Sequence, residues 1–314
     1  MAGTQEVASD IHSRARASMS EILLERASNI IEIAQKDKKM IHILWSGGID
    51  STAMVVAFSV LMEKNPALRE TITIAFCESA KEDPHHVQFY KDTVLKFKCF
   101  KLPQHIRDIF GKVDPRESIL VSGDPAHIFF GSGLISQCIL DPPTLRQDFW
   151  HLSPLYMKLE ETWNIFADYM VHKGVLSVQA KPYWVYWIQP FLDKSPIPVT
   201  TVFDFLWWCS FGLVYQHNIH RIFYNNTHET IPEEMVDMVV NFYDTLEFSQ
   251  WSYHFHQSKM HSKKVWASYK HALKDFIRKQ TKDKRYYAAK LDVQPVSYAW
   301  GFEHGLDNNY NLLR

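Results

Sequence analysis

Apolar and polar positions follow two different periods along the first part of the chain. Between residues 11 and 36, apolar side chains recur every three or four positions and charges occupy the other face, which predicts a helix. Residues 41–45 and 71–77 are short apolar runs rich in β-branched side chains, typical of buried strands. A second helix is expected between them, from about residue 51 to residue 64, ending before Pro66.

The same alternation continues to about residue 122. A helix over 84–96 leads to a short strand at 99–101, a short helix at 106–110 and a strand at 119–121. Strands that alternate with helices favour a parallel sheet, so we expect an α/β fold with helices on both faces of the sheet. Ligands bind such sheets at the carboxyl ends of the strands, near a change in strand order.

Helical patterns replace the strand pattern beyond about residue 150. Helices are expected over 155–172, 202–224 and 233–248, and a basic amphipathic helix over 263–279. The expected division of the chain is a helical lead-in, an α/β core and a mainly helical C-terminal region: 1–37, 38–150 and 151–314.

Composition narrows the class of protein. The chain has 314 residues, of which 46% are hydrophobic, and a formal net charge of −1, typical of a globular protein rather than a disordered one. This balance gives no reason to expect a membrane or a polyanion as partner. The four cysteines lack metal spacing, and no leader or spanning segment is recognised. We therefore expect a reducing, cytoplasmic location, with the cysteines buried.

The strongest functional pattern is SGGIDS at residues 46–51, between the first strand and its helix. Small residues let a phosphate approach the backbone, and the following helix offers unpaired N–H groups and the positive end of its dipole. The hydroxyls of Ser46 and Ser51 add donors, and Asp50 supplies a carboxylate for Mg²⁺ on the phosphates. The sequence has no GxxxxGK[ST] pattern, so this loop differs from the Walker phosphate loop.

SGGIDS resembles the phosphate loop of the PP-loop ATP pyrophosphatases, which cleave ATP between the α- and β-phosphates. A second stretch, Ser122-Gly123-Asp124 followed by Phe130-Gly131, is similar to a conserved stretch of the asparagine synthetase family. Both stretches follow predicted strands, so we expect them to share one site. The resemblance implies an adenine nucleotide α-hydrolase (HUP) type of fold. The family's glutamine-hydrolysing domain, with its N-terminal cysteine, is expected to be absent, because residue 2 is alanine.

The resemblance also implies roles for particular residues, with ATP and Mg²⁺ as cofactors. The implied nucleotide-binding residues are Ser46, Gly47, Gly48, Asp50, Ser51, Phe76, Ser122 and Gly123. The implied metal ligands are Asp50 and Asp124, and the implied catalytic residues are Lys290, Lys270 and Asp124. Phe76 would face adenine with its backbone, and the lysines would stabilise charge in the transition state. The family's second acidic pair falls at His127 and Ile128, so a metal ligand expected there is lost.

The family reaction joins a carboxylate to an amine. The carboxylate attacks the α-phosphorus of ATP, pyrophosphate leaves, and an amine or ammonia then displaces AMP. We expect such a carbon–nitrogen ligase, acting on small carboxylate and amine substrates, with a separate source of ammonia. Two alternatives stay open. One is a tRNA- or nucleotide-modifying PP-loop enzyme, which would use the basic stretches 96–101 and 259–290. The other is a nucleotide-binding protein without turnover.

Two clusters of side chains are expected to be structural. The aromatic run YWVYW at 183–187 is expected to pack in the core, with base stacking or an acyl pocket as the alternative. Histidines gather at 217–220 and at 254–261 with spacing that can hold a metal. They have no carboxylate at ligand spacing, so we expect them at the surface or packed against aromatic rings.

Overall fold

The computed structural model describes residues 18–77, 80, 86–103, 106–124, 126–130, 158–159, 167, 171, 176–214, 233–259, 270–284 and 286. These residues form two compact units. The first takes its residues from 1–126, 217–259 and 270–292, and the second takes its described residues from 127–216. The first unit is discontinuous in sequence, whereas the expected division was continuous. The predicted helices over 155–172 and 263–279 fall largely or partly outside the described residues.

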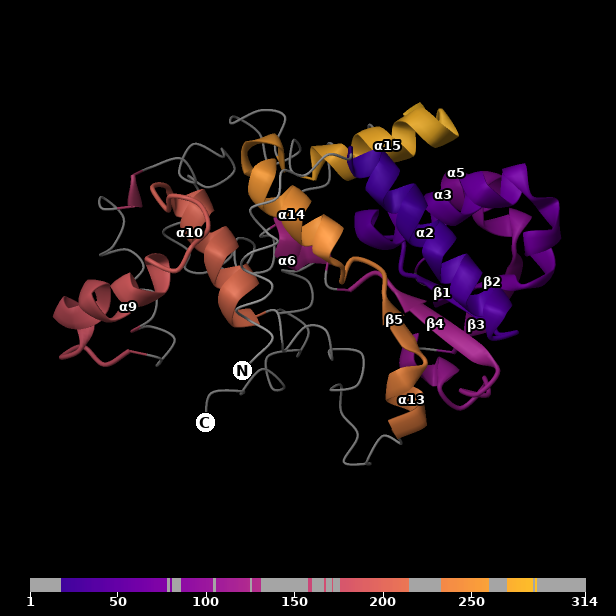
Figure 1. Cartoon of the computed structure of the whole chain (residues 1–314), viewed down its shortest axis with the longest axis horizontal. Coiled ribbons are helices and arrows are strands. Elements are labelled where there is room, and N and C mark those ends of the chain that lie inside the picture. The colour runs from indigo at the N-terminus through magenta and orange to yellow at the C-terminus, as the bar shows by residue number, and fades with distance from the viewer. Residues whose placement is uncertain are drawn as a thin grey trace. The chain divides into compact units, whose positions relative to one another are not determined.

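The first unit is built on five parallel strands in the order β3-β2-β1-β4-β5 (Figure 1). The strands are β1 (Met40–Trp45), β2 (Ile72–Cys77), β3 (Lys98–Leu102), β4 (Ser118–Ser122) and β5 (Val239–Asn241). The chain adds β2 and β3 outward from β1, then crosses to the other side of β1 to form β4. The strand order therefore reverses between β1 and β4, and the prediction of a parallel α/β sheet is confirmed.

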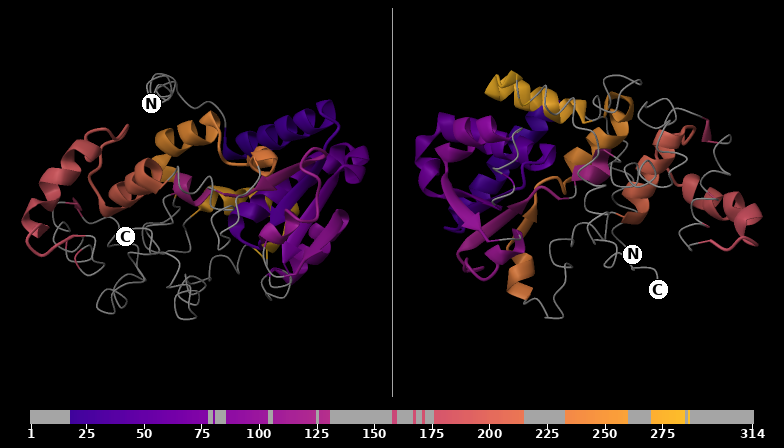
Figure 2. Two further views of the ribbon diagram at one scale, coloured as in Figure 1. Left: turned by 90° about the horizontal axis from the view of Figure 1, so that it is seen from below. Right: turned by 180° about the vertical axis from the view of Figure 1, so that it is seen from behind.

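Helix α3 (Ile49–Lys64) is the central helix of this unit. It packs on β1 and is contacted in turn by α2 (Met19–Lys36) and α15 (His271–Thr281) (Figures 1 and 2). Every residue from Ser51 to Ser59 is buried, although two serines and a threonine are among them. A helix that is apolar on nearly all sides is stable only inside a core, and here the sheet and two helices provide one.

Shorter helices complete the connections. The 3-10 helix Pro66–Glu70 precedes β2, while α5 (Val87–Asp92) and the 3-10 helix Val94–Lys96 precede β3. The 3-10 helix Ile106–Ile109 precedes β4, and α6 (Ala126–Phe130) follows β4. Around β5 lie α13 (Glu233–Asp237), α14 (Leu246–His254) and the 3-10 helix His256–Lys259. Parallel strands need crossover connections of this kind, because a tight hairpin cannot join them.

The other face of the sheet carries a second apolar cluster. Because side chains alternate along a strand, Leu44 points away from the face that holds Ile43 and Trp45. The buried members of the cluster are Leu44, Ala75, Leu102, Ile109, Leu120 and Met238. On this face, the described residues that pack against the strands come from 106–113 and from Met238, just before β5, and not from a long helix.

The prediction of one helix over 233–248 is wrong in its middle. Residues 233–237 are helical, but 239–241 form β5, which pairs in parallel with β4. The register places Val240 opposite Val121. Two adjacent valines fit a pleated surface well, and β4 supplies the backbone partners. Periodicity within the segment could not reveal that distant pairing.

In the second unit, apolar helices have different degrees of burial. Helix α10 (Val202–Cys209) continues into a π-helical turn, Ser210–Val214, and its Trp207 is buried. The rest of the helix predicted over 202–224 lies outside the described residues. Helix α9 (Trp184–Leu192) follows the 3-10 helix Lys181–Tyr183 and buries only Leu192. The predicted core packing of the 183–187 run is wrong for its exposed members: Tyr183, Tyr186 and Trp187 are 60%, 80% and 55% exposed.

Cysteine burial differs from site to site. Cys209 is buried, Cys77 is half-buried and Cys99 is exposed, and all three are free thiols. The prediction of buried cysteines is therefore wrong for Cys99, which lies on β3, the edge strand of the described sheet, while Cys138 lies outside the described residues. Within the described residues, no helix combines the length and the apolar character needed to cross a lipid bilayer.

His42 links three neighbouring strands. Its Nδ1 lies 2.6 Å from Thr73 Oγ1 on β2, and its Nε2 lies 3.2 Å from Ser118 Oγ on β4. Burial lowers the pKa of His42 below its usual value, because the imidazolium loses hydration inside the sheet. The fold therefore favours neutral His42.

We predict that acid destabilises the protein partly through His42. The unfolded chain binds a proton at a pKa of about 6.5, above the folded-state value, so the free energy of unfolding falls as pH drops below about 6.5. The His42→Gln variant should lose this part of the pH dependence. Thermal melts of wild type, His42→Gln and His254→Gln between about pH 5 and 8 measure it, His254 being an exposed control. An equally steep decline in His42→Gln would contradict the prediction.

Candidate functional site

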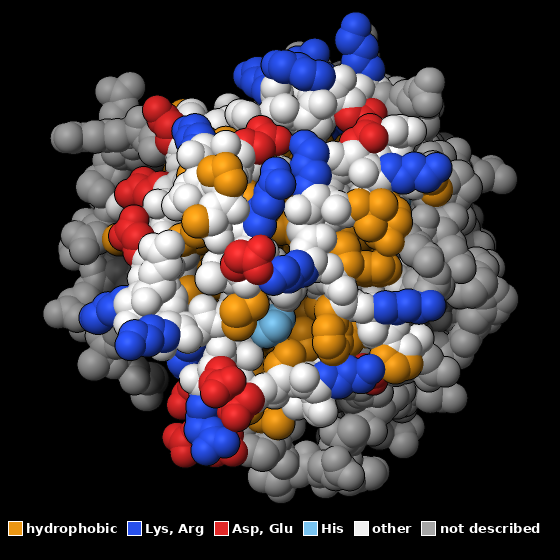
Figure 3. All heavy atoms as spheres, turned by 90° about the vertical axis from the view of Figure 1, so that its right-hand side faces the viewer, with side chains coloured by type: hydrophobic (Ala, Val, Ile, Leu, Met, Phe, Trp, Pro, Cys, Tyr) orange, Lys and Arg blue, Asp and Glu red, His pale blue; other side chains and the backbone are white. Residues whose placement is uncertain are grey.

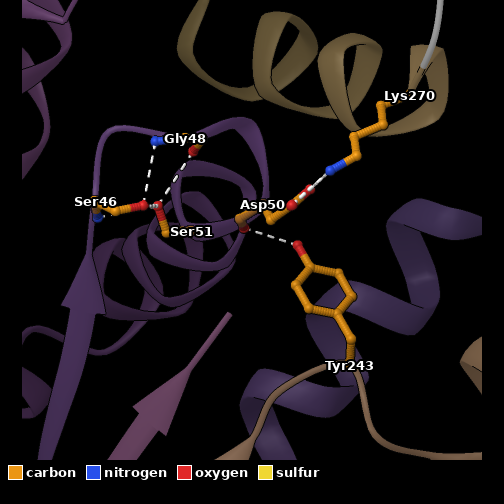
Figure 4. A network of polar contacts seen from close by, with 6 residues as sticks. All are labelled: Ser46, Gly48, Asp50, Ser51, Tyr243 and Lys270. Atoms are coloured by element: carbon orange, nitrogen blue, oxygen red, sulfur yellow. Dashed lines mark hydrogen bonds and ion pairs between the residues drawn. The ribbon is translucent and has the colours of Figure 1, made fainter. Parts of the chain in front are cut away.

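The loop between β1 and α3 is held by hydrogen bonds among its own residues (Figure 4). The backbone N–H of Ser46 donates to Ser51 Oγ over 3.2 Å, and the two serine hydroxyl oxygens lie 3.1 Å apart. Ser51 Oγ donates to the carbonyl of Gly48 over 3.2 Å. The hydroxyls that the sequence suggested as phosphate donors thus brace the loop from within.

Gly47 turns this loop with a backbone that favours glycine. Its φ is +77°, in the left-handed region. A Cβ there would lie 2.3 Å from His86 Nδ1, so the histidine ring packs directly on the loop. His86 is buried, and its Nδ1 lies 3.2 Å from the carbonyl oxygen of Ala80. Sequence reasoning did not assign His86 to the site, and its one signal is a position shortly after the carboxyl end of β2.

The second small-residue stretch reaches the same place. Gly123 follows β4, and a Cβ on it would lie 3.3 Å from the backbone nitrogen of Ser51. The stretch therefore lies against the first turn of α3, and the two stretches share one edge of the sheet as expected. Asp124 is half-buried beside it, and its backbone N–H donates to Ser122 Oγ over 3.2 Å.

Asp50, in the first turn of α3, meets two side chains from late in the chain (Figure 4). Lys270 Nζ lies 2.6 Å and 2.5 Å from its two carboxylate oxygens. Tyr243 Oη donates to the backbone carbonyl of Asp50 over 2.8 Å. Tyr243 is fully buried, and this burial raises its pKa well above the usual value. Its hydroxyl therefore stays protonated near neutral pH and holds the helix start in place.

Most of the predicted site residues come together. At the carboxyl ends of β1 and β4, the two strand ends, the loops after them and the first turn of α3 contain Ser46, Gly47, Gly48, Asp50, Ser51, Ser122, Gly123 and Asp124. Lys270 contacts Asp50. Phe76 lies on β2 with its ring in the core against Trp45 and Tyr90. The role predicted for Phe76 belongs to its backbone and stays a prediction. Lys290 and the side chain of His127 lie outside the described residues. Ile128 is buried in α6 and supplies no metal ligand.

The site fits Mg²⁺ only in part. Mg²⁺ takes one or two carboxylates from a protein when phosphates complete its shell, and Asp50 and Asp124 are such groups. Among the described residues, no three His, Cys, Asp or Glu side chains gather into a metal site of their own. His256, from the C-terminal histidine cluster, lies instead 2.9 Å from Lys259 Nζ. A metal on Asp50 would compete with Lys270, because the ammonium contacts both of its oxygens.

Comparisons with known proteins do not extend this picture. No model of a known protein family matches the chain, and neither does any curated protein or solved structure. The resemblance to PP-loop enzymes therefore rests on the residues of the two stretches alone.

We predict unequal effects of alanine at the two loop glycines. Gly47→Ala puts a methyl group on left-handed backbone and against His86, so it should lower the free energy of unfolding by about 1–3 kcal/mol. Gly48→Ala is the matched control. Its φ is −64°, and the nearest atom to a Cβ is Ser46 Oγ at 3.4 Å, so its loss should be below about 1 kcal/mol. Urea unfolding measures both, and equal losses would contradict this reading of the loop.

Proposed function

We propose that this chain is an ATP-dependent enzyme that adenylates a carboxylate, releases pyrophosphate and transfers the acyl group to an amine or ammonia. The observation that carries the proposal is the meeting of Asp50, Lys270 and two small-residue loops at the carboxyl ends of β1 and β4. The strand order reverses between these two strands, and parallel α/β sheets bind their ligands at such a point.

The parts of the site match what this reaction needs. The first turn of α3 would cradle pyrophosphate with its backbone N–H groups and the helix dipole, and the small residues 46–48 would let the phosphates approach closely. Asp50 and Asp124 would hold Mg²⁺, which when bound would neutralise part of the phosphate charge. Lys270 would stabilise charge on the leaving group, with Lys290 as the other candidate. Holding two reactants in line and spreading charge is most of the work in phosphoryl and adenylyl chemistry.

ATP turnover by the purified chain tests the proposal. With Mg²⁺, ammonium and a panel of small carboxylic acids, we predict equal amounts of AMP and pyrophosphate, formed only when an acid is present. Asp50→Asn and Lys270→Met should each lower the rate at least about 100-fold. Lys279→Met is the control, because Lys279 lies on α15 with a 60% exposed side chain. Formation of ADP, or no acid-dependent AMP with any acid, would overturn the proposal.

A second candidate is a nucleotide-binding protein without turnover. Two observations favour it: Ile128 is buried where the asparagine synthetases carry an acid, and the carboxylate of Asp50 is already engaged by Lys270. In this case ATP would raise the melting temperature, but the assay above would yield no AMP.

The basic stretches give little support to a nucleic-acid substrate. Lys96 pairs with Glu63 over 3.0 Å, Lys98 pairs with Glu70, and Lys259 is fully buried. On the face drawn in Figure 3, Lys and Arg side chains mingle with Asp and Glu and with hydrophobic clusters, rather than forming one basic patch. Binding to a phosphate backbone depends on exposed cations that are free to replace counterions.

A further inference from the structure

The carboxylate of Asp50 is paired with a cation that the chain itself supplies. Lys270 Nζ lies 2.6 Å from Oδ1 and 2.5 Å from Oδ2, so one ammonium contacts both oxygens. The side chains of Lys270 and Asp50 are only 10% and 24% exposed. Salt screens such a shielded pair weakly, and removing either partner leaves a charge without its counter-ion in a largely buried place.

Lys270 stands where a lysine is otherwise unfavourable. Its backbone is left-handed, with φ 54° and ψ 32°, which is strained for a residue other than glycine. It also precedes the first turn of α15, where the helix dipole disfavours a positive charge. Lys38 and Lys282 share the left-handed backbone, but they are exposed. Of these three lysines, Lys270 is the one that turns inward, and its contact with Asp50 offsets the unfavourable position.

A divalent metal would compete with Lys270 for this carboxylate. Mg²⁺ binds a carboxylate oxygen at about 2.0–2.1 Å, so on either oxygen of Asp50 it would place two positive charges close to an ammonium that already contacts both. The described residues hold no cluster of three or more ligating side chains that would compensate for breaking the ion pair. A nucleotide polyphosphate would compensate, because it offers oxygens to the metal and negative charge to the released ammonium.

We propose that Lys270 is an internal counter-ion, which a divalent metal displaces from Asp50 only when a nucleotide polyphosphate binds with it. The metal takes the carboxylate, and the ammonium of Lys270 moves to the polyphosphate. The ion pair thereby excludes free metal ions from the site and couples metal binding to nucleotide binding. This inference rests on the proposed function, which supplies the nucleotide. Its first consequence, that the nucleotide-free protein binds metal ions weakly, can be tested without a nucleotide.

Titration with Mn²⁺, followed by electron paramagnetic resonance, tests this consequence on the nucleotide-free protein. Wild type should bind Mn²⁺ weakly, and Lys270→Gln at least about ten-fold more tightly, within the usual range for coupled sites. The double variant Asp50→Asn/Lys270→Gln should lose this gain in Mn²⁺ affinity. Lys282→Gln is the control, because Lys282 has the same left-handed backbone as Lys270 but is exposed. With ATP present, wild type should bind Mn²⁺ more tightly than Lys270→Gln.

Two results on folded protein would overturn the inference: equal Mn²⁺ affinity in Lys270→Gln and wild type, or tight Mn²⁺ binding by nucleotide-free wild type. If Lys270→Gln does not fold, acetylation of the wild-type amines tests the same point. Labelling of Lys270, read by peptide mass spectrometry, should stay constant with Mn²⁺ alone and change when Mn²⁺ and ATP are added together; a rise with Mn²⁺ alone, or no change with both, would overturn the inference. A failure of the proposed function can be told apart from a failure of this inference. In the first case no acid-dependent AMP would form, but the Mn²⁺ affinities would still differ as predicted.

Discussion

The parallel pairing of β1 with both β2 and β4 is the constraint on which the candidate site depends. The register sets Ile43 beside Ile74 on one side and Val121 on the other, so the three strands end at the same edge. The loop after β1 then enters α3, a helix surrounded by the sheet, α2 and α15. A helix enclosed in this way has little freedom to move, so its first turn holds Asp50 at the edge where the loop after β4 arrives.

Local sequence was enough to predict the strands near the candidate site, but it was not enough to predict the elements further along the chain. The first four strands lie within one residue of their predicted ends, because each is a short apolar run between turn residues. β5 was missed because three residues of a valine-rich segment resemble part of a helix until β4 lies beside them. Helix α9 shows a different error, because its aromatic residues predicted burial and several of them are exposed. Hydrophobicity alone does not determine which apolar helix is packed against other elements.

The candidate site could likewise be predicted from sequence only in part. Its two loops could be found from sequence because small residues and an acid at fixed spacing carry the pattern. The partners of Asp50 are 220 and 193 residues away in Lys270 and Tyr243, and only the packing of distant segments brings them there. Lys270 was indicated by resemblance alone, without its ion pair. His86 gave no sequence signal beyond its place after β2, since its role depends on the backbone angle of Gly47.

The discontinuity of the first unit has a consequence for synthesis on the ribosome. Residues 127–216 are translated before β5 and α15, which complete the sheet edge and cover α3. At about 5–20 residues per second, Lys270 follows Asp50 by roughly ten to forty seconds. During that interval the nascent chain presents an unpaired strand edge at β4 and apolar helix surface on α3, the features that invite aggregation. The topology therefore leaves these surfaces uncovered until the later segments have been translated.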